Sequence, residues 1–217
     1  MPISVNCKLL LYADDSALLV RGKNPSHIAQ ILSNNLKSCS HWIIDNKLSL
    51  HLGKTESILF GSKKKLREVH EFEVKCDDKI IKNVQSVKYL GLILDENLSG
   101  ESLVNNILKK SSGRLKFLYR YSDILDKKAR KTLCSALIQC NFDYASSSWY
   151  TGLSKGLKQK LQIMQNKTVR FILNLGNRAH VGSKEFDKLD ILSVTDRVKQ
   201  NKLNYILKFI MEQALNI

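Results

Sequence analysis

Two short apolar runs flank an acidic pair near the start of the chain. The runs cover residues 9–12 and 17–20, and Asp14 and Asp15 lie between them. Each run is long enough for a buried strand, and the gap suits a tight turn. The pattern predicts an antiparallel β-hairpin with strands over 5–12 and 16–21.

Apolar residues at helical spacing follow this hairpin. The positions are Ile28, Ile31, Leu32, Leu36, Cys39 and Ile43. They predict one amphipathic helix over about 26–44 that packs its apolar stripe on the hairpin. Because Ser26 follows the break at Asn24-Pro25, we expect Ser26 to cap this helix.

Shorter segments complete the first part of the chain. Apolar positions alternate over 48–52, which predicts a short strand or an extended connection. A second short strand is predicted over 57–61, and the lysine run 63–65 is expected to be a solvated loop. The segments 72–76 and 80–84 predict an exposed hairpin around a second acidic pair, Asp77-Asp78.

The apolar run 87–95 predicts a single strand with Gly91 inside it. Glycine within a strand often marks a bulge or the close approach of another backbone or ligand. Turn-forming residues follow at 97–100, and we place the domain boundary there. The resulting domains are 1–98 and 99–217.

Apolar spacing after residue 100 is almost entirely helical. A first helix begins at Glu101 and carries a basic face made of Lys109, Lys110, Arg114, Lys116 and Arg120. We expect a second helix capped by Asp126, a third over about 144–149 and a fourth over about 154–174. A short helix capped by Ser183 is expected to run to Leu189, and a last one from Thr195 to about Leu215.

Cysteine usage and hydropathy limit where the protein acts. The five cysteines are odd in number and widely spaced, without a Cys-x-x-Cys pair, which favours a reducing compartment and no zinc site. No apolar run approaches the roughly 18 residues of a membrane span, and the start of the chain lacks a secretory pattern. We therefore expect an intracellular protein with no membrane partner; nucleus and cytoplasm are not distinguished.

The net charge of +15 is concentrated in the second part of the chain. Residues 101–217 hold 21 Lys and Arg against 9 Asp and Glu, whereas the first hundred hold 14 against 11. Such asymmetry favours a polyanionic partner for the second part. A solvated basic surface that maintains solubility is the alternative.

The first acidic pair has two interpretations. Buried charges are costly unless they are paired or bind a metal, so carboxylates between buried strands favour a divalent-metal site. Asp is also common in solvated turns, and the spacing by itself does not decide between the two. The Asp77-Asp78 pair has mixed, charged flanks, and we interpret it as an ordinary turn.

Three segments in order resemble a known family. They are 12–15 (Tyr-Ala-Asp-Asp), 46–50 (Asn-Lys-Leu-Ser-Leu) with Lys54-Thr55, and 88–95 with its Tyr-Leu-Gly. This set resembles the later part of the reverse transcriptase domain of non-LTR retrotransposons, closest to the jockey-like branch. Residues 142–145 and 161–170 also resemble segments that follow in such elements.

The resemblance implies an α+β fold, in which the end of a polymerase palm (an antiparallel hairpin with a packed helix) precedes an all-helical, thumb-like domain. It implies that Asp14 and Asp15 are metal ligands for Mg²⁺ or Mn²⁺ at the catalytic centre. Lys54 matches a lysine proposed to protonate pyrophosphate, although an ordinary surface lysine is equally consistent.

The resemblance also implies nucleic-acid contacts. Tyr12 would pack near the primer terminus, and Tyr89, Leu90 and Gly91 match the primer grip, with plain core strand as the alternative. The implied partners are an RNA template, a DNA primer and, where a full site is completed, deoxynucleoside triphosphates. The basic helix face would contact phosphates of the primer–template duplex.

One departure from the family is large. A palm needs another metal-binding Asp from an earlier strand, together with fingers, but none of the 11 residues before Tyr12 is acidic. Two-metal catalysis needs ions roughly 3.5–4 Å apart, which one carboxylate pair cannot hold in fixed geometry. We expect no polymerisation by this chain alone. A non-catalytic nucleic-acid-binding remnant and a relic without a partner are the alternatives.

Overall fold

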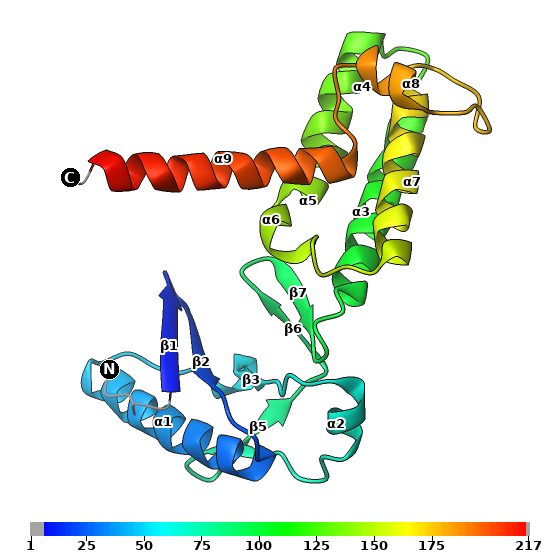
Figure 1. The fold of residues 1–217 in the computed structure, drawn as a ribbon. Coiled ribbons are helices and arrows are strands. Elements are labelled where there is room, and N and C mark those ends of the chain that lie inside the picture. Colours follow the sequence, from blue (N-terminus) through cyan, green and yellow to red (C-terminus); the bar gives the residue numbers. More distant parts are fainter. Residues whose placement is uncertain (1–6, 216–217) are drawn as a thin grey trace. The chain divides into compact units, whose positions relative to one another are not determined.

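The computed structural model describes residues 7–215, with side chains through residue 213 (Figure 1). The fold is mixed α+β, with small sheets in the first part and helices in the second. The chain divides into two compact units, 1–98 and 99–217. Each unit has its own core and is described by itself.

The predicted opening hairpin is confirmed over the described residues. Strands β1 (Cys7–Tyr12) and β2 (Asp15–Val20) pair antiparallel, with Tyr12 opposite Asp15 and Cys7 opposite Val20. Residues 5–6, where we placed the start of the first strand, lie outside the described part of the chain. Within the described part, these two strands form a sheet of their own.

Helix α1 (Pro25–Asp45) confirms the predicted amphipathic helix, but its cap differs from the prediction. The Asn24 side chain, not Ser26, accepts hydrogen bonds from the backbone N–H groups of Ser26 (2.9 Å) and His27 (3.3 Å). Pro25 explains the shift, because proline suits the first helical position and places Asn24 at the N-cap.

A three-stranded sheet covers α1 in the first unit. Its order is β3 (Glu56–Ser57), β5 (Lys79–Asn83), β4 (Val74–Cys76), with β3 parallel and β4 antiparallel to β5. The Ser33 hydroxyl accepts from the Lys75 backbone N–H at 2.9 Å and ties α1 to β4. The core comprises Ala29, Leu36, Val74, Cys76 and Ile81, flanked by Leu18, Leu32, Leu50, Leu52 and Phe72.

Two predictions for the connecting segments need correction. The lysine run 63–65 is not a loop but belongs to helix α2 (Lys63–Arg67), because Ser62 caps it by accepting from the Lys65 N–H at 3.4 Å. The predicted strand over 57–61 is regular only at its start, in β3. Residues 48–51 form no regular element and connect α1 to the 3₁₀ turn η1 (Leu52–Lys54).

The prediction of one strand over 87–95 is wrong. Strands β6 (Ser86–Tyr89) and β7 (Leu92–Asp95) pair antiparallel as a tight hairpin. Leu90 and Gly91 form its two-residue turn, with φ of +44° and +80°. A turn with positive φ at both central residues matches the twist of the flanking strands, so Gly91 supports the turn rather than a bulge.

The second unit is helical. Its elements are α3 (Glu101–Tyr119), α4 (Lys127–Cys134), the π-helical turn η2 (Ser135–Gln139), α5 (Cys140–Asp143), α6 (Ser146–Trp149), α7 (Lys155–Ile172), α8 (Ser183–Asp187) and α9 (Val194–Leu215). Helices α3, α4 and α7 pack lengthwise (Figure 1). Their shared core includes Val104, Ile138, Leu161 and Phe171.

Helix caps in this unit follow the sequence in most places. Asp126 accepts from the Ala129 N–H at 2.7 Å, as predicted, and Ser154 accepts from the Leu157 N–H at 3.3 Å. Ser183 lies inside α8 rather than capping it, since Gly182 takes the N-cap position.

Buried polar groups join α7 to the start of α9. The Gln165 side chain is buried; it accepts from the Val194 N–H at 3.0 Å and donates to the Leu192 carbonyl at 2.9 Å. Arg197 on α9 pairs with Asp143 at 3.4 Å. These contacts fix the first turns of α9 against the bundle.

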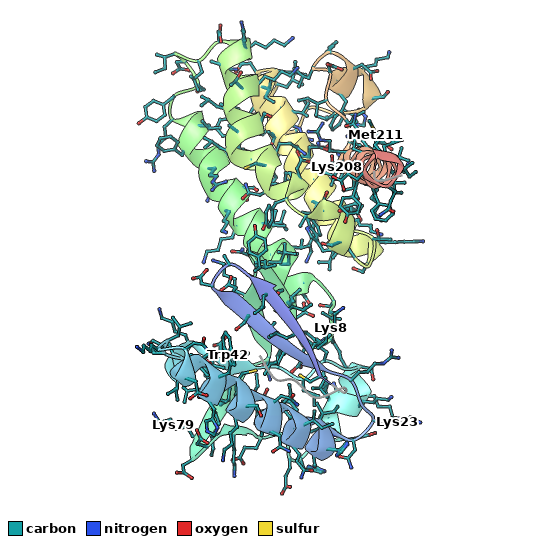
Figure 2. The ribbon with its side chains drawn as sticks, turned by 90° about the vertical axis from the view of Figure 1, so that its left-hand side faces the viewer. Lys8, Lys23, Trp42, Lys79, Lys208 and Met211 are labelled. Carbon is teal, nitrogen blue, oxygen red and sulfur yellow. The ribbon has the colours of Figure 1, made fainter. Side chains whose placement is uncertain are left out.

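The C-terminal half of α9 leaves the bundle. More than half of the side-chain surface is exposed at several apolar positions there, and Figure 2 shows Lys208 and Met211 on this part; the positions are Leu203, Ile206, Leu207, Ile210 and Met211.

At the N-terminal end of α9, a hydrogen bond from Ser193, with a further contribution from Lys199, lowers the pKa of the Asp196 carboxyl. Among the described helices, none has the length and apolar character to span a membrane.

Candidate functional site

The acidic pair lies at the turn of the β1–β2 hairpin. Ala13 and Asp14 are the two turn residues, and Asp15 opens β2 opposite Tyr12. Directly opposed residues in an antiparallel pair share a face, so Tyr12 and Asp15 lie side by side. Ala13 has φ of +51°, a left-handed conformation that costs an alanine about 1–2 kcal/mol.

The two carboxylates face solvent, which corrects the premise that they lie between buried strands. Asp14 and Asp15 are exposed, and the neighbouring Leu11 and Tyr12 are 62% and 66% exposed. Within the described residues, neither carboxylate has a hydrogen bond or ion pair at its side chain. Burial therefore gives no reason for a metal here.

The turn at Asp77-Asp78 serves as a comparison, because its backbone resembles that of the turn at Ala13-Asp14. It also has two residues between directly paired strand residues, and Asp77 has φ of +50°. Its charge has partners, however: Asp77 pairs with Lys37 at 3.4 Å and lies 3.9 Å from His41. The two acidic turns share their length and the left-handed φ of their first residue, and they differ in their charged neighbours.

The first turn offers two carboxylates as potential oxygen ligands, which is fewer than a two-ion centre requires. Mg²⁺ prefers oxygen ligands and often uses one or two carboxylates with waters and substrate phosphates. Over residues 7–213, no three His, Cys, Asp or Glu side chains gather closely enough to hold a metal ion. A two-ion arrangement therefore lacks its ligands among these residues.

Lys54 ends the turn η1 and is exposed. It forms no ion pair within 4 Å of either carboxylate, and Glu56 pairs with Lys82 (4.0 Å) instead. The structure thus brings Tyr12, Asp14 and Asp15 together, whereas Lys54 is not joined to them by any ion pair.

The Tyr-Leu-Gly segment forms the tip of the β6–β7 hairpin. Tyr89 opposes Leu92 across the turn, and Leu90 and Gly91 are the turn itself. Gly91 is exposed, whereas Tyr89 and Leu90 are half-buried. The plain core-strand alternative is wrong for Leu90 and Gly91, which form the turn, whereas Tyr89 ends strand β6.

The basic face of α3 is narrower than the sequence suggests. Lys109, Lys116 and Arg120 are exposed and lie at i, i+7 and i+11, on one stripe opposite the buried residues. Gly113 lies between them on the same stripe, and a Cβ there would meet no atom within 4 Å. Lys110 is exposed on the neighbouring stripe.

Arg114 does not belong to this surface, contrary to the prediction. It is half-buried, and its guanidinium donates to the Leu137 carbonyl within the π-helical turn η2. The Asn141 amide donates to the same carbonyl at 2.9 Å. A π-helical turn interrupts regular helical hydrogen bonding, and these side chains supply donors for it.

Two exposed aromatic residues beside the stripe were not singled out by the sequence pattern. Phe117 and Tyr121 are 51% and 45% exposed, and their ring centroids lie 5.2 Å apart with the planes tilted by 57°. Tyr119, between them in sequence, is 41% exposed and packs edge-on against Phe171, with ring centroids 4.8 Å apart. The sequence signal for this pair is the spacing of two aromatic residues four positions apart, each preceded by a basic residue.

An open hollow of about 900 Å³ lies elsewhere in the first unit. It is lined by the connection from β2 to α1 and by residues 59–71, including Ile28, Phe60 and Leu66. None of the sequence-predicted site residues lines it.

Comparisons of the chain with models of protein families, with curated proteins and with solved structures give no match.

Proposed function

We propose that the chain is part of a reverse transcriptase of a non-LTR retrotransposon, comprising the end of the palm and a helical, thumb-like unit. The observation that carries the proposal is the ordered set of motifs in residues 12–15, 46–55 and 88–95. The first of these forms a hairpin turn with an exposed carboxylate pair, and the third forms a second hairpin turn.

Within this proposal, each hairpin presents its motif differently. Asp14 and Asp15 offer oxygen ligands for one Mg²⁺ or Mn²⁺ ion, and Tyr12 lies beside Asp15 on the same face. When bound, the metal would neutralise phosphate charge. At the second turn, Gly91 leaves the backbone accessible to a primer strand. The remaining ligands and the fingers would have to come from outside these residues.

A primer-extension assay with a primed RNA template, in Mg²⁺ and in Mn²⁺, tests the catalytic state. We expect no template-dependent incorporation from this chain alone, because the second metal lacks ligands among the described residues. Incorporation that Asp14→Ala abolishes would overturn the expectation of inactivity and establish the activity. Asp77→Ala, at the turn with the same backbone, is the matched control.

Nucleic-acid binding without catalysis is the second candidate function. The exposed stripe of Lys109, Lys116 and Arg120 on α3 favours it, since three cations on one helix face can neutralise three phosphates. Lys109 and Arg120 are eleven positions apart along the helix, which corresponds to roughly 16 Å. In addition, residues 109–131 hold 9 basic residues against 2 acidic ones.

The salt dependence of duplex binding tests this second function. Each phosphate contact lowers log K by about 0.9 per tenfold rise in salt on B-DNA. The triple variant Lys109→Ala, Lys116→Ala, Arg120→Ala should therefore flatten the slope by about 2.7. The matched control neutralises Lys23, Lys64 and Lys79, three exposed lysines of the first unit that lie outside the motifs. Binding that does not respond to salt would refute the proposal.

A further inference from the structure

The C-terminal end of α3 combines exposed rings with exposed cations. Phe117 and Tyr121 lie one helical turn apart, in contact with each other. Lys116 and Arg120 each precede one of these rings in sequence, and because consecutive helical residues point about 100° apart, the basic stripe lies on the helix face next to that of the aromatic pair. We call Phe117, Tyr121, Lys116 and Arg120 the α3 platform.

Contacts of Arg130 on α4 anchor the end of α3 that carries the α3 platform. Arg130 on α4 is buried; it donates to the Ser122 carbonyl at 2.6 Å and to the Phe171 carbonyl at 3.3 Å. Its guanidinium also lies 5.4 Å from the centre of the Phe171 ring. Because Ser122 directly follows Tyr121, these contacts join the end of α3 to α7.

We propose that the α3 platform is a stacking site for unpaired nucleobases, and that the helical unit binds single-stranded nucleic acid there. Any base can stack on an exposed aromatic ring, and adjacent cations bind the phosphates that connect successive bases. The rings are tilted against each other rather than stacked face to face, and both residues are about half exposed, so part of each ring is open to solvent. The inference rests on the proposed nucleic-acid binding and names its substrate class.

The charge around the platform favours this occupant over an apolar protein surface. Asp123 is the acidic residue nearest in sequence, whereas Lys109, Lys110, Lys127 and Lys128 add exposed positive charge on α3 and at the start of α4. An apolar partner would have to desolvate these cations, which is unfavourable. A polyanion with flat apolar bases satisfies both the cations and the rings.

The test compares a single-stranded oligonucleotide with an abasic oligomer of the same length, which carries the same phosphates without bases. Binding is measured by fluorescence anisotropy on the full chain. We expect the oligonucleotide to bind more tightly. Phe117→Leu and Tyr121→Leu should each raise its Kd by about 5- to 140-fold, the range for loss of one stacked base. Both variants should leave the Kd of the abasic oligomer unchanged.

The leucine variants keep apolar area at exposed positions and remove only the ring. Tyr205→Leu is the control, since Tyr205 is exposed on α9 between two uncharged residues. A second readout uses Phe117→Trp in a chain that also carries Trp42→Phe and Trp149→Phe, so that the new tryptophan is the remaining one. Its fluorescence should be quenched by the oligonucleotide and not by the abasic oligomer. Equal affinity for both oligomers, with no effect of the ring variants, would overturn the stacking site.

The two proposals fail in different ways. If the chain binds neither oligomer nor duplex at low salt, the proposed nucleic-acid binding is wrong, and the stacking site falls with it. If both oligomers bind equally and with a salt slope that Lys116→Ala and Arg120→Ala reduce, the basic stripe stands and the stacking site is wrong.

Discussion

Replacing Arg130 perturbs the end of α3 without changing any exposed basic residue. The guanidinium is buried, spans the carbonyls of Ser122 and Phe171, and faces the Phe171 ring. No carboxylate lies within 4 Å of it among the described residues. Its fixed fork therefore joins two backbone segments that a single ammonium cannot join equally well.

The expected cost follows from these contacts. Hydrogen bonds from a charged donor contribute roughly 1.5–3 kcal/mol each, and a desolvated cation–π contact contributes about 2 kcal/mol. Burial of an unpaired cation offsets several kcal/mol of this gain. We expect Arg130→Ala and Arg130→Lys to lower the free energy of unfolding by about 2–4 kcal/mol. Arg130→Met restores apolar volume and should lower it by about 1–2 kcal/mol.

Urea denaturation measures this in a chain carrying Trp42→Phe. Trp149 is then the remaining tryptophan, and its indole N–H donates to the Tyr144 carbonyl inside the helical unit. Its fluorescence therefore reports on that unit. Lys128→Ala, at an exposed position on α4, should stay within about 0.5 kcal/mol of the parent. An Arg130→Lys variant as stable as the parent would refute the bridging role of the guanidinium.

Three further outcomes follow from the helical unit. Gly113→Ala should raise the free energy of unfolding by about 0.5–1 kcal/mol in the same assay, since the position is helical and open; a loss of stability would contradict this. Burial raises the pKa of the Cys134 thiol to about 12, so at pH 8 a thiol reagent should modify exposed Cys140 first and Cys134 only on unfolding. The lowered pKa of Asp196 stabilises the fold above the unfolded value of 3.8, and this contribution is lost as the pH falls through the folded pKa. The difference in free energy of unfolding between the parent and Asp196→Asn should therefore shrink as the pH falls. A difference that does not change with pH would contradict this role of Asp196.

The sequence predicts those parts of the fold where one strong local pattern acts alone. The six apolar positions of α1 and the Asp126 cap are examples, since spacing and capping chemistry are sufficient. The β6–β7 hairpin is not predictable in this way. Leu90 adopts a left-handed conformation that leucine disfavours, and the continuous apolar run masks the turn.

The contacts of individual side chains are harder to predict from the sequence than the helices and strands that carry them. Arg114 shares the helix and the charge of Lys109 and Lys116, but it turns toward a carbonyl in a π-helical turn that no sequence pattern announces. The sequence pattern predicts the hairpin turn at Asp14-Asp15 but also predicts buried flanking strands, whereas Leu11 and Tyr12 are exposed. This exposure depends on the absence of a covering element among the described residues, which the local sequence does not encode.

The opening hairpin has a consequence for the behaviour of the chain at high concentration. Each of its strands pairs with the other along one edge, and within the described residues the outer edges have no partner strand. Exposed edges with apolar side chains, such as Leu11 and Leu19, are templates for pairing with other chains. Edge-to-edge aggregation is therefore the expected failure of the isolated protein, and its onset depends on concentration more than on the stability of the helical unit.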